Sequence, residues 1–295
     1  MNKILYVVLV SVLCLAAGCG NAQKELLFTP GEGVVSFRTG DAFGNREVKL
    51  YYYIPDGEPE KMPLQIIMHG AGRNADEYLL SMKNQADAYK IMLLAPEFPK
   101  KVFLNREYQE GGILDSTGNR APDEKTAYAV IDRIFEFVQE HSALTCKTYN
   151  IFGHSAGGQF VHRFLLFHNS PYVARAVAAN AGWYTYPDTA IAYPYGVKGM
   201  FTDAGELKRR YYAKDLTILL GTADTIRDKD FRVTPEAELQ GGTRLARGRA
   251  FYALNEAAAS ESGLPFNWKI DYVQDSGHDF WKMSPAGADL LYPHP

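Results

Sequence analysis

The sequence predicts an α/β fold, a single doubly wound domain with a mostly parallel sheet and helices on both faces. Apolar runs of strand length alternate with amphipathic helical patterns along most of the 295 residues. No internal repeat, low-complexity tract or linker divides the alternation. The composition, 46% hydrophobic and 22% charged, is that of a soluble globular protein with enough chain for a large core.

The first half of the chain opens with a predicted hairpin. Residues 33–40 (GVVSFRTG) and 46–57 (REVKLYYYIPDG) are β-rich and are bounded by glycine and proline. Residues 64–70 and 91–98 then read as continuous apolar strands, and residues 74–89 between them predict a helix with Asn74 and Glu77 at capping-box spacing. Strand, helix and strand in this order indicate a parallel pair.

The alternation continues through the second half. Residues 123–141 predict an amphipathic helix, 147–152 a strand and 159–169 a second helix. Residues 175–182 and 216–221 are further apolar strands, and a helix near residues 243–261 precedes a last strand at 267–273. Ligands of such sheets bind beyond the carboxyl ends of the strands, so the chemistry is expected at that edge.

The N-terminal residues predict a targeting segment. Lys3 precedes an apolar run at residues 4–17 that is too short to span a membrane and is closed by small residues. We therefore expect a signal peptide at residues 1–18. The ending LAAGC resembles the lipobox of bacterial lipoproteins, which implies lipid modification of Cys19. An ordinary signal peptide with an incidental cysteine is the alternative.

This interpretation fixes the expected organisation and location. Residues 19–30 would be a tether, residues 31–295 the catalytic domain, and the protein would be held in the bacterial cell envelope by the lipid on Cys19. Cys14 leaves with the signal peptide, so Cys146 is a lone thiol, expected to be a buried packing residue. The net charge of -3 makes nucleic acid an unexpected partner.

The segment GHSAG at residues 153–157 indicates a nucleophile. It matches G-x-S-x-G and lies between a predicted strand and a predicted helix, the context that this motif requires. The sharp turn strains the central residue and leaves no room for side chains two positions away. It would lift the hydroxyl of Ser155 above the sheet, at a helix N-terminus that favours developing negative charge. A glycine-rich turn with an ordinary N-cap serine is the alternative.

A serine nucleophile needs a histidine base and a carboxylate that orients it, and this architecture orders them Ser, acid, His. Asp224 follows the strand at 216–221, and His278 follows the last strand. Asp228 and Asp230 remain alternative acids if the loop after the strand is longer. Two further carboxylates flank the histidine and are expected to shape its loop or face solvent; they are Asp275 and Asp279.

The oxyanion hole requires two backbone N–H groups. The first is expected from Ala156, directly after the serine. The second is expected from the loop HGAGRN after the strand at 64–70, at Ala71.

With these residues, the chain from about residue 34 to 278 resembles the α/β-hydrolase superfamily. The segments IIMHGAGRNADEY, IFGHSAGGQFVHRF, LLGTADT and SGHDFW look like those of serine esterases related to polyhydroxybutyrate depolymerases and to feruloyl or acetylxylan esterases. The resemblance implies acyl-enzyme chemistry with no metal or organic cofactor, assigned to Ser155, Asp224 and His278.

The substrate is expected to be a carboxylic ester with a short acyl or feruloyl group, either small or linked to polysaccharide. An aromatic segment at residues 183–201 lies between two strands on the catalytic side, and we expect Trp183 and Tyr184 to contact the substrate. Two other classes stay open: a serine peptidase of the same fold, and a non-catalytic binding protein that retains it.

Overall fold

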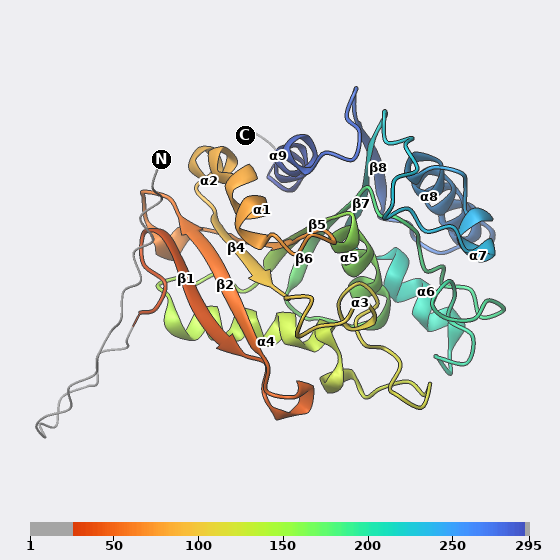
Figure 1. The fold of residues 1–295 in the computed structure, drawn as a ribbon, viewed down its shortest axis with the longest axis horizontal. Helices are drawn as coiled ribbons and strands as arrows, with labels where there is room; N and C mark the ends of the chain where they lie inside the picture. Colours follow the sequence, from red (N-terminus) through yellow and green to blue (C-terminus); the bar gives the residue numbers. More distant parts are fainter. Residues whose placement is uncertain (1–25, 293–295) are drawn as a thin grey trace, which may run out of the picture.

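Eight strands form one sheet that contains both halves of the chain (Figure 1). The structure is a computed structural model that describes residues 26–292. The strand order is β1-β2-β4-β3-β5-β6-β7-β8; β2 is antiparallel to both of its neighbours, and the remaining pairs are parallel. The expected fold class is therefore confirmed, including the opening hairpin.

Strands and helices alternate along most of the chain. The strands are β1 (Gly31–Arg38), β2 (Glu47–Ile54), β3 (Leu64–Met68), β4 (Met92–Glu97), β5 (Tyr149–His154), β6 (Val173–Ala179), β7 (Leu216–Gly221) and β8 (Lys269–Val273). The α-helices are α1 (Ala75–Ser81), α2 (Lys83–Tyr89), α3 (Asn105–Tyr108), α4 (Ala127–His141), α5 (Ala156–Phe167), α6 (Ala204–Tyr212), α7 (Pro235–Glu238), α8 (Arg244–Glu261) and α9 (Phe280–Leu291). Three short 3-10 helices are η1 (Asp41–Phe43), η2 (Pro59–Lys61) and η3 (Asp123–Lys125).

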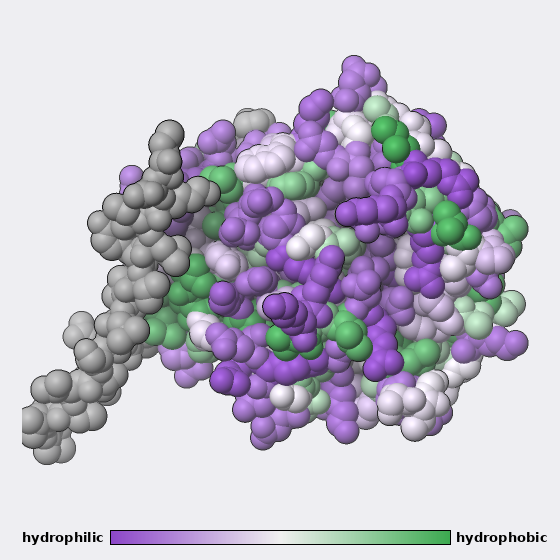
Figure 2. All heavy atoms as spheres, in the orientation of Figure 1, coloured by the Kyte–Doolittle hydropathy of each residue, from purple (hydrophilic) through white to green (hydrophobic). Residues whose placement is uncertain are grey.

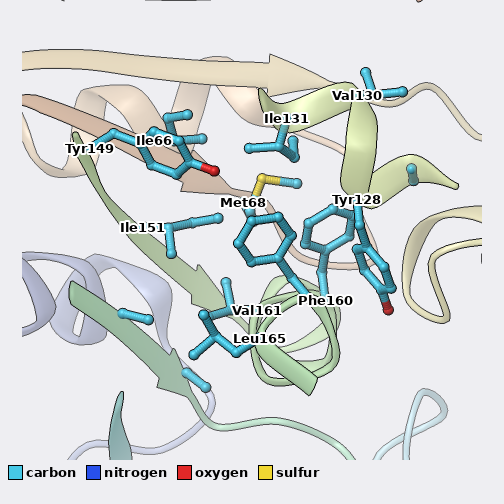
Figure 3. Packing of buried hydrophobic residues seen from close by; sticks show 14 of the residues in the cluster. Ile66, Met68, Tyr128, Val130, Ile131, Tyr149, Ile151, Phe160, Val161 and Leu165 are labelled. Carbon is cyan, nitrogen blue, oxygen red and sulfur yellow. The ribbon is translucent and has the colours of Figure 1, made fainter. Parts of the chain in front are cut away.

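Helices cover both faces of the sheet. On one face α1, α2 and α9 pack over a cluster that includes Ile67, Phe152 and Val177. On the other face α4 and α5 pack over the alternate side chains of the same strands (Figure 3). Ten side chains of this layer, from the strands and from the two helices, are at most 1% exposed: Ile66, Met68, Tyr128, Val130, Ile131, Tyr149, Ile151, Phe160, Val161 and Leu165. Burial of one large apolar side chain contributes about 1.5–3 kcal/mol, so this layer anchors β5 and α5 firmly.

The predicted helix at residues 74–89 is two helices. α1 ends at Ser81 and α2 begins at Lys83, with Met82 between them. The capping box expected at Asn74 is wrong, because the Asn74 side-chain amide donates to the Glu77 carboxylate at 2.5 Å and caps no backbone group. The side chains thus satisfy each other instead of the helix end.

Four α-helices are not expected from the sequence; α3 and α7 have four residues each, and α6 and α9 are longer. α6 lies within the aromatic-rich region after residue 183. Most of its residues are polar, so its short amphipathic pattern is difficult to recognise in the sequence. α9 contains Pro285, a residue that normally ends or kinks a helix, although its buried face packs on β5 and β6. Tertiary packing decides both cases, because each helix covers apolar surface of the sheet or of α5.

Several expectations concern residues outside the described part of the chain. The signal peptide at 1–18, the lipid-modified Cys19 and the first part of the tether all precede residue 26. Within residues 26–292, no helix combines the length and apolarity that a membrane crossing requires. Cys146 is a free thiol and is half-buried against the core. The face seen in Figure 2 is mainly hydrophilic, with apolar residues in scattered groups.

A buried carboxylate joins α4, β5 and the loop after α5 at the edge of the sheet opposite the carboxyl ends of the strands. Asp132 on α4 accepts from Tyr149 Oη at 2.8 Å and Ser170 Oγ at 2.7 Å, and its other oxygen lies 2.9 Å from His168 Nε2. Asp132→Ala should lower the free energy of unfolding by about 3 kcal/mol, because three polar partners lose their acceptor. Chemical denaturation measures this loss; the turnover of the folded fraction should be unchanged, and a fall in it would contradict a purely structural role.

Candidate active site

The nucleophile candidate occupies a sharp turn between β5 and α5. Ser155 has φ 58° and ψ -115°, a conformation that an L-residue adopts only when its surroundings impose it. β5 ends at His154 and α5 begins at Ala156, so the serine lies directly at a helix N-terminus. The free N–H groups of that first helical turn point toward the same edge of the sheet as the serine.

Two glycines make this turn possible. A Cβ on Gly157 would lie 1.9 Å from the carbonyl oxygen of Met68, and a Cβ on Gly153 would lie 2.2 Å from the carbonyl oxygen of Gly157. Because both obstacles are backbone atoms, neither can rotate aside. The steric reason expected from the sequence for glycine two positions before and after Ser155 is thus found in the structure.

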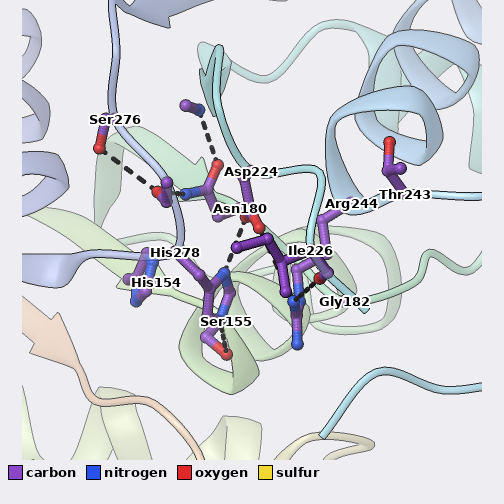
Figure 4. A network of polar contacts seen from close by, with 12 residues as sticks. His154, Ser155, Asn180, Gly182, Asp224, Ile226, Thr243, Arg244, Ser276 and His278 are labelled. Carbon is purple, nitrogen blue, oxygen red and sulfur yellow. Dashed lines mark hydrogen bonds and ion pairs between the residues drawn. The ribbon is translucent and has the colours of Figure 1, made fainter. Parts of the chain in front are cut away.

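The structure brings Ser155, His278 and Asp224 into one hydrogen-bonded series (Figure 4). His278 Nε2 lies 2.8 Å from Ser155 Oγ, and His278 Nδ1 lies 2.8 Å from Asp224 Oδ2. The Asp224 side chain is 1% exposed, whereas that of His278 is 23% exposed. With the proton on Nδ1, the histidine donates to the carboxylate and presents a basic Nε2 to the serine hydroxyl.

Asn180 fixes the two loops that carry the histidine and the aspartate. Its Oδ1 accepts from the N–H of Gly221 at 2.8 Å, and its Nδ2 donates to the carbonyl of Gly277 at 3.2 Å. A backbone bond from Ala223 to Ser276 (2.9 Å) joins the same loops. The loop after β7 and the loop after β8 are therefore one connected unit.

The other carboxylates near the histidine have different partners. Asp228 bonds to Arg244, and Asp279 caps α9 through the N–H of Trp281 at 2.9 Å. The N–H groups of Asp230 and Asp275 donate to Asp228 Oδ1 and Thr222 Oγ1, respectively. Of the three candidate acids, Asp224, Asp228 and Asp230, Asp224 is the one that contacts the imidazole.

The two positions expected to form an oxyanion hole flank the serine. Ala156 is the first residue of α5. Ala71 lies in the turn after β3, and a Cβ on the preceding residue, Gly70, would be 3.7 Å from Ser155 Cβ. The backbone of this turn therefore passes directly beside the serine side chain. Donors from these two segments would approach an oxygen above Ser155 from two sides.

Two buried histidines close to the site remain neutral. Burial, with smaller effects from His278 and Arg244, lowers the pKa of His154 well below its usual range, and its Nδ1 lies 2.8 Å from the hydroxyl of Tyr78. The rings of His154 and His278 are 4.7 Å apart. Burial also lowers the pKa of His69 to about 3, and its Nε2 accepts from the N–H of Phe98. A neutral His154 places no competing positive charge against His278.

Trp183 and Tyr184 are core residues, which corrects the expectation that they contact the substrate. Tyr184 is fully buried and stacks on Phe251 at 4.3 Å, and Trp183 is 2% exposed. The Trp183 ring is covered by two guanidinium groups, with Arg163 Cζ at 3.9 Å and Arg232 Cζ at 4.4 Å from its centroid. The Tyr184 ring packs between α5 and α8, and Trp183 forms a small cluster with Tyr195 and Ala237.

Two arginines of α8 are not singled out by the sequence. Arg247 donates to the carbonyls of Gly182, Arg232 and Gly241 at 2.7–2.9 Å, and Arg244 binds the loop that contains Asp224 and Asp228. Both side chains are at most 2% exposed. In the sequence they belong to TRLARGRA, a charged segment typical of an exposed helix, so no local pattern indicates that they are buried.

One apolar cavity among residues 26–292 lies apart from this series, and these residues contain no cluster of metal-ligand type. A cavity of about 530 Å³ is lined mainly by apolar and aromatic residues, among them Tyr186, Tyr195 and Leu254, and none of the three bonded side chains borders it. No three His, Cys, Asp or Glu side chains of the described residues are grouped so that they could hold a metal ion.

The chain is similar to solved hydrolase structures over most of its length. No protein-family model matches the chain, and a search of curated proteins gives no match. Among solved structures, poly(aspartic acid) hydrolase-1 from Sphingomonas sp. KT-1 aligns at a TM-score of 0.85 and 42% identity, over 90% of this chain and 100% of that chain. LpqC, a poly(3-hydroxybutyrate) depolymerase from Bordetella parapertussis, aligns at 0.84 and 30% identity, over 90% and 91%. The S-formylglutathione hydrolase FrmB from Staphylococcus aureus, at 0.55 and 15% identity over 88% and 97%, shares the fold.

Proposed function

The chain belongs to the α/β-hydrolase family of poly(aspartic acid) hydrolase-1 and the LpqC depolymerase, and from this premise we propose that it is a serine hydrolase of carboxylic esters. The observation that supports this most strongly is the series of two 2.8 Å contacts from Ser155 through His278 to Asp224. A hydroxyl, a base and a buried carboxylate at this spacing are the parts that acyl transfer requires.

The proposed reaction begins with proton transfer from Ser155 to His278. Ser155 Oγ attacks the ester carbonyl as its proton moves to Nε2, and Asp224 stabilises the imidazolium through Nδ1. The N–H groups of Ala71 and Ala156 would hold the oxyanion of the tetrahedral intermediate. The imidazolium then protonates the leaving alkoxide, which departs as the alcohol, and an acyl-enzyme remains.

Water completes the cycle by the same route. His278 takes a proton from a water molecule, the hydroxide attacks the acyl carbon, and the second tetrahedral intermediate collapses. Ser155 Oγ leaves and recovers the proton from the imidazolium. The free acid is released and the starting hydrogen-bonded series is restored.

We propose a short acyl group and an exposed ester, rather than a long chain in a deep pocket. The 530 Å³ cavity among the described residues lies away from Ser155, and Trp183 and Tyr184 are buried. Anchoring of the protein in the cell envelope through Cys19 would suit esters of an extracellular polymer, and this location is part of the proposal. A feruloyl preference has less support, because Trp183 and Tyr184, the aromatic residues expected to contact the substrate, are buried.

A second candidate activity is hydrolysis of the amide bonds of poly(aspartic acid). The 42% identity to a poly(aspartic acid) hydrolase over that entire chain favours it. Two arginines, Arg163 and Arg232, lie against Trp183, and one carboxylate, Glu110, approaches Arg232 at 3.7 Å. Arg163 is fully buried, so Arg232, whose side chain is 33% exposed, is the member of this pair that would meet an anionic polymer.

Rates on matched substrates distinguish these activities. Acetyl, butyryl and feruloyl esters, oligomers of 3-hydroxybutyrate, poly(aspartic acid) and an aminoacyl anilide should be incubated with the wild type and with Ser155→Ala. We expect turnover of the short esters by the wild type alone. Cleavage of poly(aspartic acid) without the esters would select the second candidate, and cleavage of the anilide alone would indicate a peptidase. Failure of Ser155 to react with a fluorophosphonate would support a non-catalytic protein and contradict the proposal.

A further inference from the structure

The carboxylate of Asp224 has an unusual environment on the side that faces away from His278. Oδ2 accepts from the imidazole, whereas Oδ1 is buried and has no hydrogen-bond donor among residues 26–292. The nearest positive group is the guanidinium of Arg244, whose Nη1 is 3.7 Å from Oδ1 and whose side chain is 2% exposed. A buried carboxylate with an unsatisfied oxygen is costly, so this charge contact has an electrostatic role.

The loop after β7, which contains Asp224, also holds the side chain of Arg244 in place. Nη1 donates to the carbonyl of Ile226 at 3.2 Å (Figure 4). Nη2 donates to Asp228 Oδ1 at 2.8 Å. The arginine is the first residue of α8, and the N–H of the next residue, Leu245, donates to the carbonyl of Asp224 at 3.3 Å. Side chain and helix end thus fix the same loop, and both present positive charge to it.

We propose that Arg244 is a positioning residue for the hydrolytic reaction, which keeps Asp224 ionised and oriented and sets the pH at which His278 becomes a free base. This inference depends on the proposed function, because it assigns Arg244 a role through the Ser155, His278 and Asp224 series. Arg244 itself touches no reacting atom.

The charges around Asp224 and His278 determine in which direction the loss of Arg244 would shift the pH dependence. The titratable and charged groups that face this pair from the neighbouring elements are His154 on β5, Tyr78 on α1, Tyr184 after β6, Asp228 on the loop after β7 and Arg244 on α8. Asp275 and Asp279 adjoin the histidine in the sequence. His154 is neutral, and Asp228 carries a carboxylate whose pKa is lowered mainly by its bond to Arg244. Arg244 is the positive group that adjoins the Asp224 carboxylate.

Loss of that positive charge should make the imidazolium easier to form. The acidic limb of kcat/KM reports protonation of His278 in the free enzyme. Arg244 disfavours the imidazolium and competes with it for the charge of Asp224, so its removal favours the imidazolium. Arg244→Gln should therefore move the acidic limb to higher pH by about one unit and lower the plateau about ten- to hundredfold.

Asp228 offers the opposite test. Its side chain is 39% exposed, so Asp228→Asn is expected to fold, and it removes a negative charge that offsets Arg244. The acidic limb should then move to lower pH, by about half a unit. Arg244→Lys keeps the charge and should keep the limb near its wild-type position, although the lost contacts lower the plateau.

The experiment is a pH profile of kcat/KM for the wild type, Arg244→Gln, Arg244→Lys and Asp228→Asn. The substrate is a neutral butyrate ester, and titration of the released acid measures the rate. Opposite shifts for Arg244→Gln and Asp228→Asn, with Arg244→Lys near the wild type, support the inference. Unmoved limbs with lowered plateaus would show that Arg244 only holds the loop. If Arg244→Gln does not fold, the direction of the Asp228→Asn shift decides. A wild type without esterase activity would instead refute the proposed function.

Discussion

Replacement of Ser155 by alanine is expected to lower kcat on a short ester by about a million-fold. In the proposed reaction Ser155 Oγ attacks the ester, and in the variant His278 Nε2, which lies 2.8 Å from Oγ in the wild type, has no serine proton to accept. The residual rate would come from the oxyanion donors and from substrate binding. Initial rates with a butyrate ester, together with loss of fluorophosphonate labelling, measure this effect.

The chain provides a matched control for this variant. Ser170 also lies in a cluster with an aspartate and a histidine, because its Oγ donates to Asp132, which contacts His168. This cluster is at the opposite edge of the sheet, so Ser170→Ala should leave kcat unchanged. Substantial turnover by Ser155→Ala would contradict the assignment of the nucleophile.

Asp224→Asn should lower kcat about ten-thousandfold, because the amide favours the wrong imidazole tautomer.

Gly157→Ala should destabilise the protein by more than about 3 kcal/mol and abolish activity. The new methyl group would lie 1.9 Å from the carbonyl oxygen of Met68, so β3 and α5 must separate and the turn at Ser155 must change. Urea unfolding gives the loss of stability, and ester hydrolysis gives the loss of function.

A glycine with open surroundings serves as the comparison. A Cβ added to Gly242, which precedes α8, would meet no heavy atom within 4 Å, so Gly242→Ala should change stability by less than about 0.5 kcal/mol. Equal stability of the Gly157→Ala and Gly242→Ala proteins would show that the elbow tolerates side chains at this position.

The centre of the sheet can be predicted from the sequence because its strands are buried on both faces. β3, β4 and β7 are almost entirely buried, and each appears in the sequence as a mainly apolar run. The helices are less predictable. The break at Met82 and the helix around Pro285 depend on what lies beneath them, which local composition does not encode.

The site is predictable in the parts that are tied to strand ends. Ser155, Asp224 and His278 each follow a recognisable strand, and the topology places those ends at one edge. Trp183 is misjudged because aromatic side chains in a loop look alike whether they face solvent or, as in this fold, lie under Arg232. Arg244 escapes notice because its burial arises from a contact between α8 and the earlier loop that carries Asp224.

Asn180 has a consequence for how the enzyme would lose activity on heating. Within the described sheet β8 is one of the two edge strands and pairs with β7, and the loop after it carries His278, so local unfolding at this edge reaches the site. Because Asn180 joins the loops after β7 and β8, opening of this edge would strain Asp224 and His278 as a unit and withdraw both from Ser155. Inactivation would then begin at the edge of the sheet, while the core between α4, α5 and β5 is still intact.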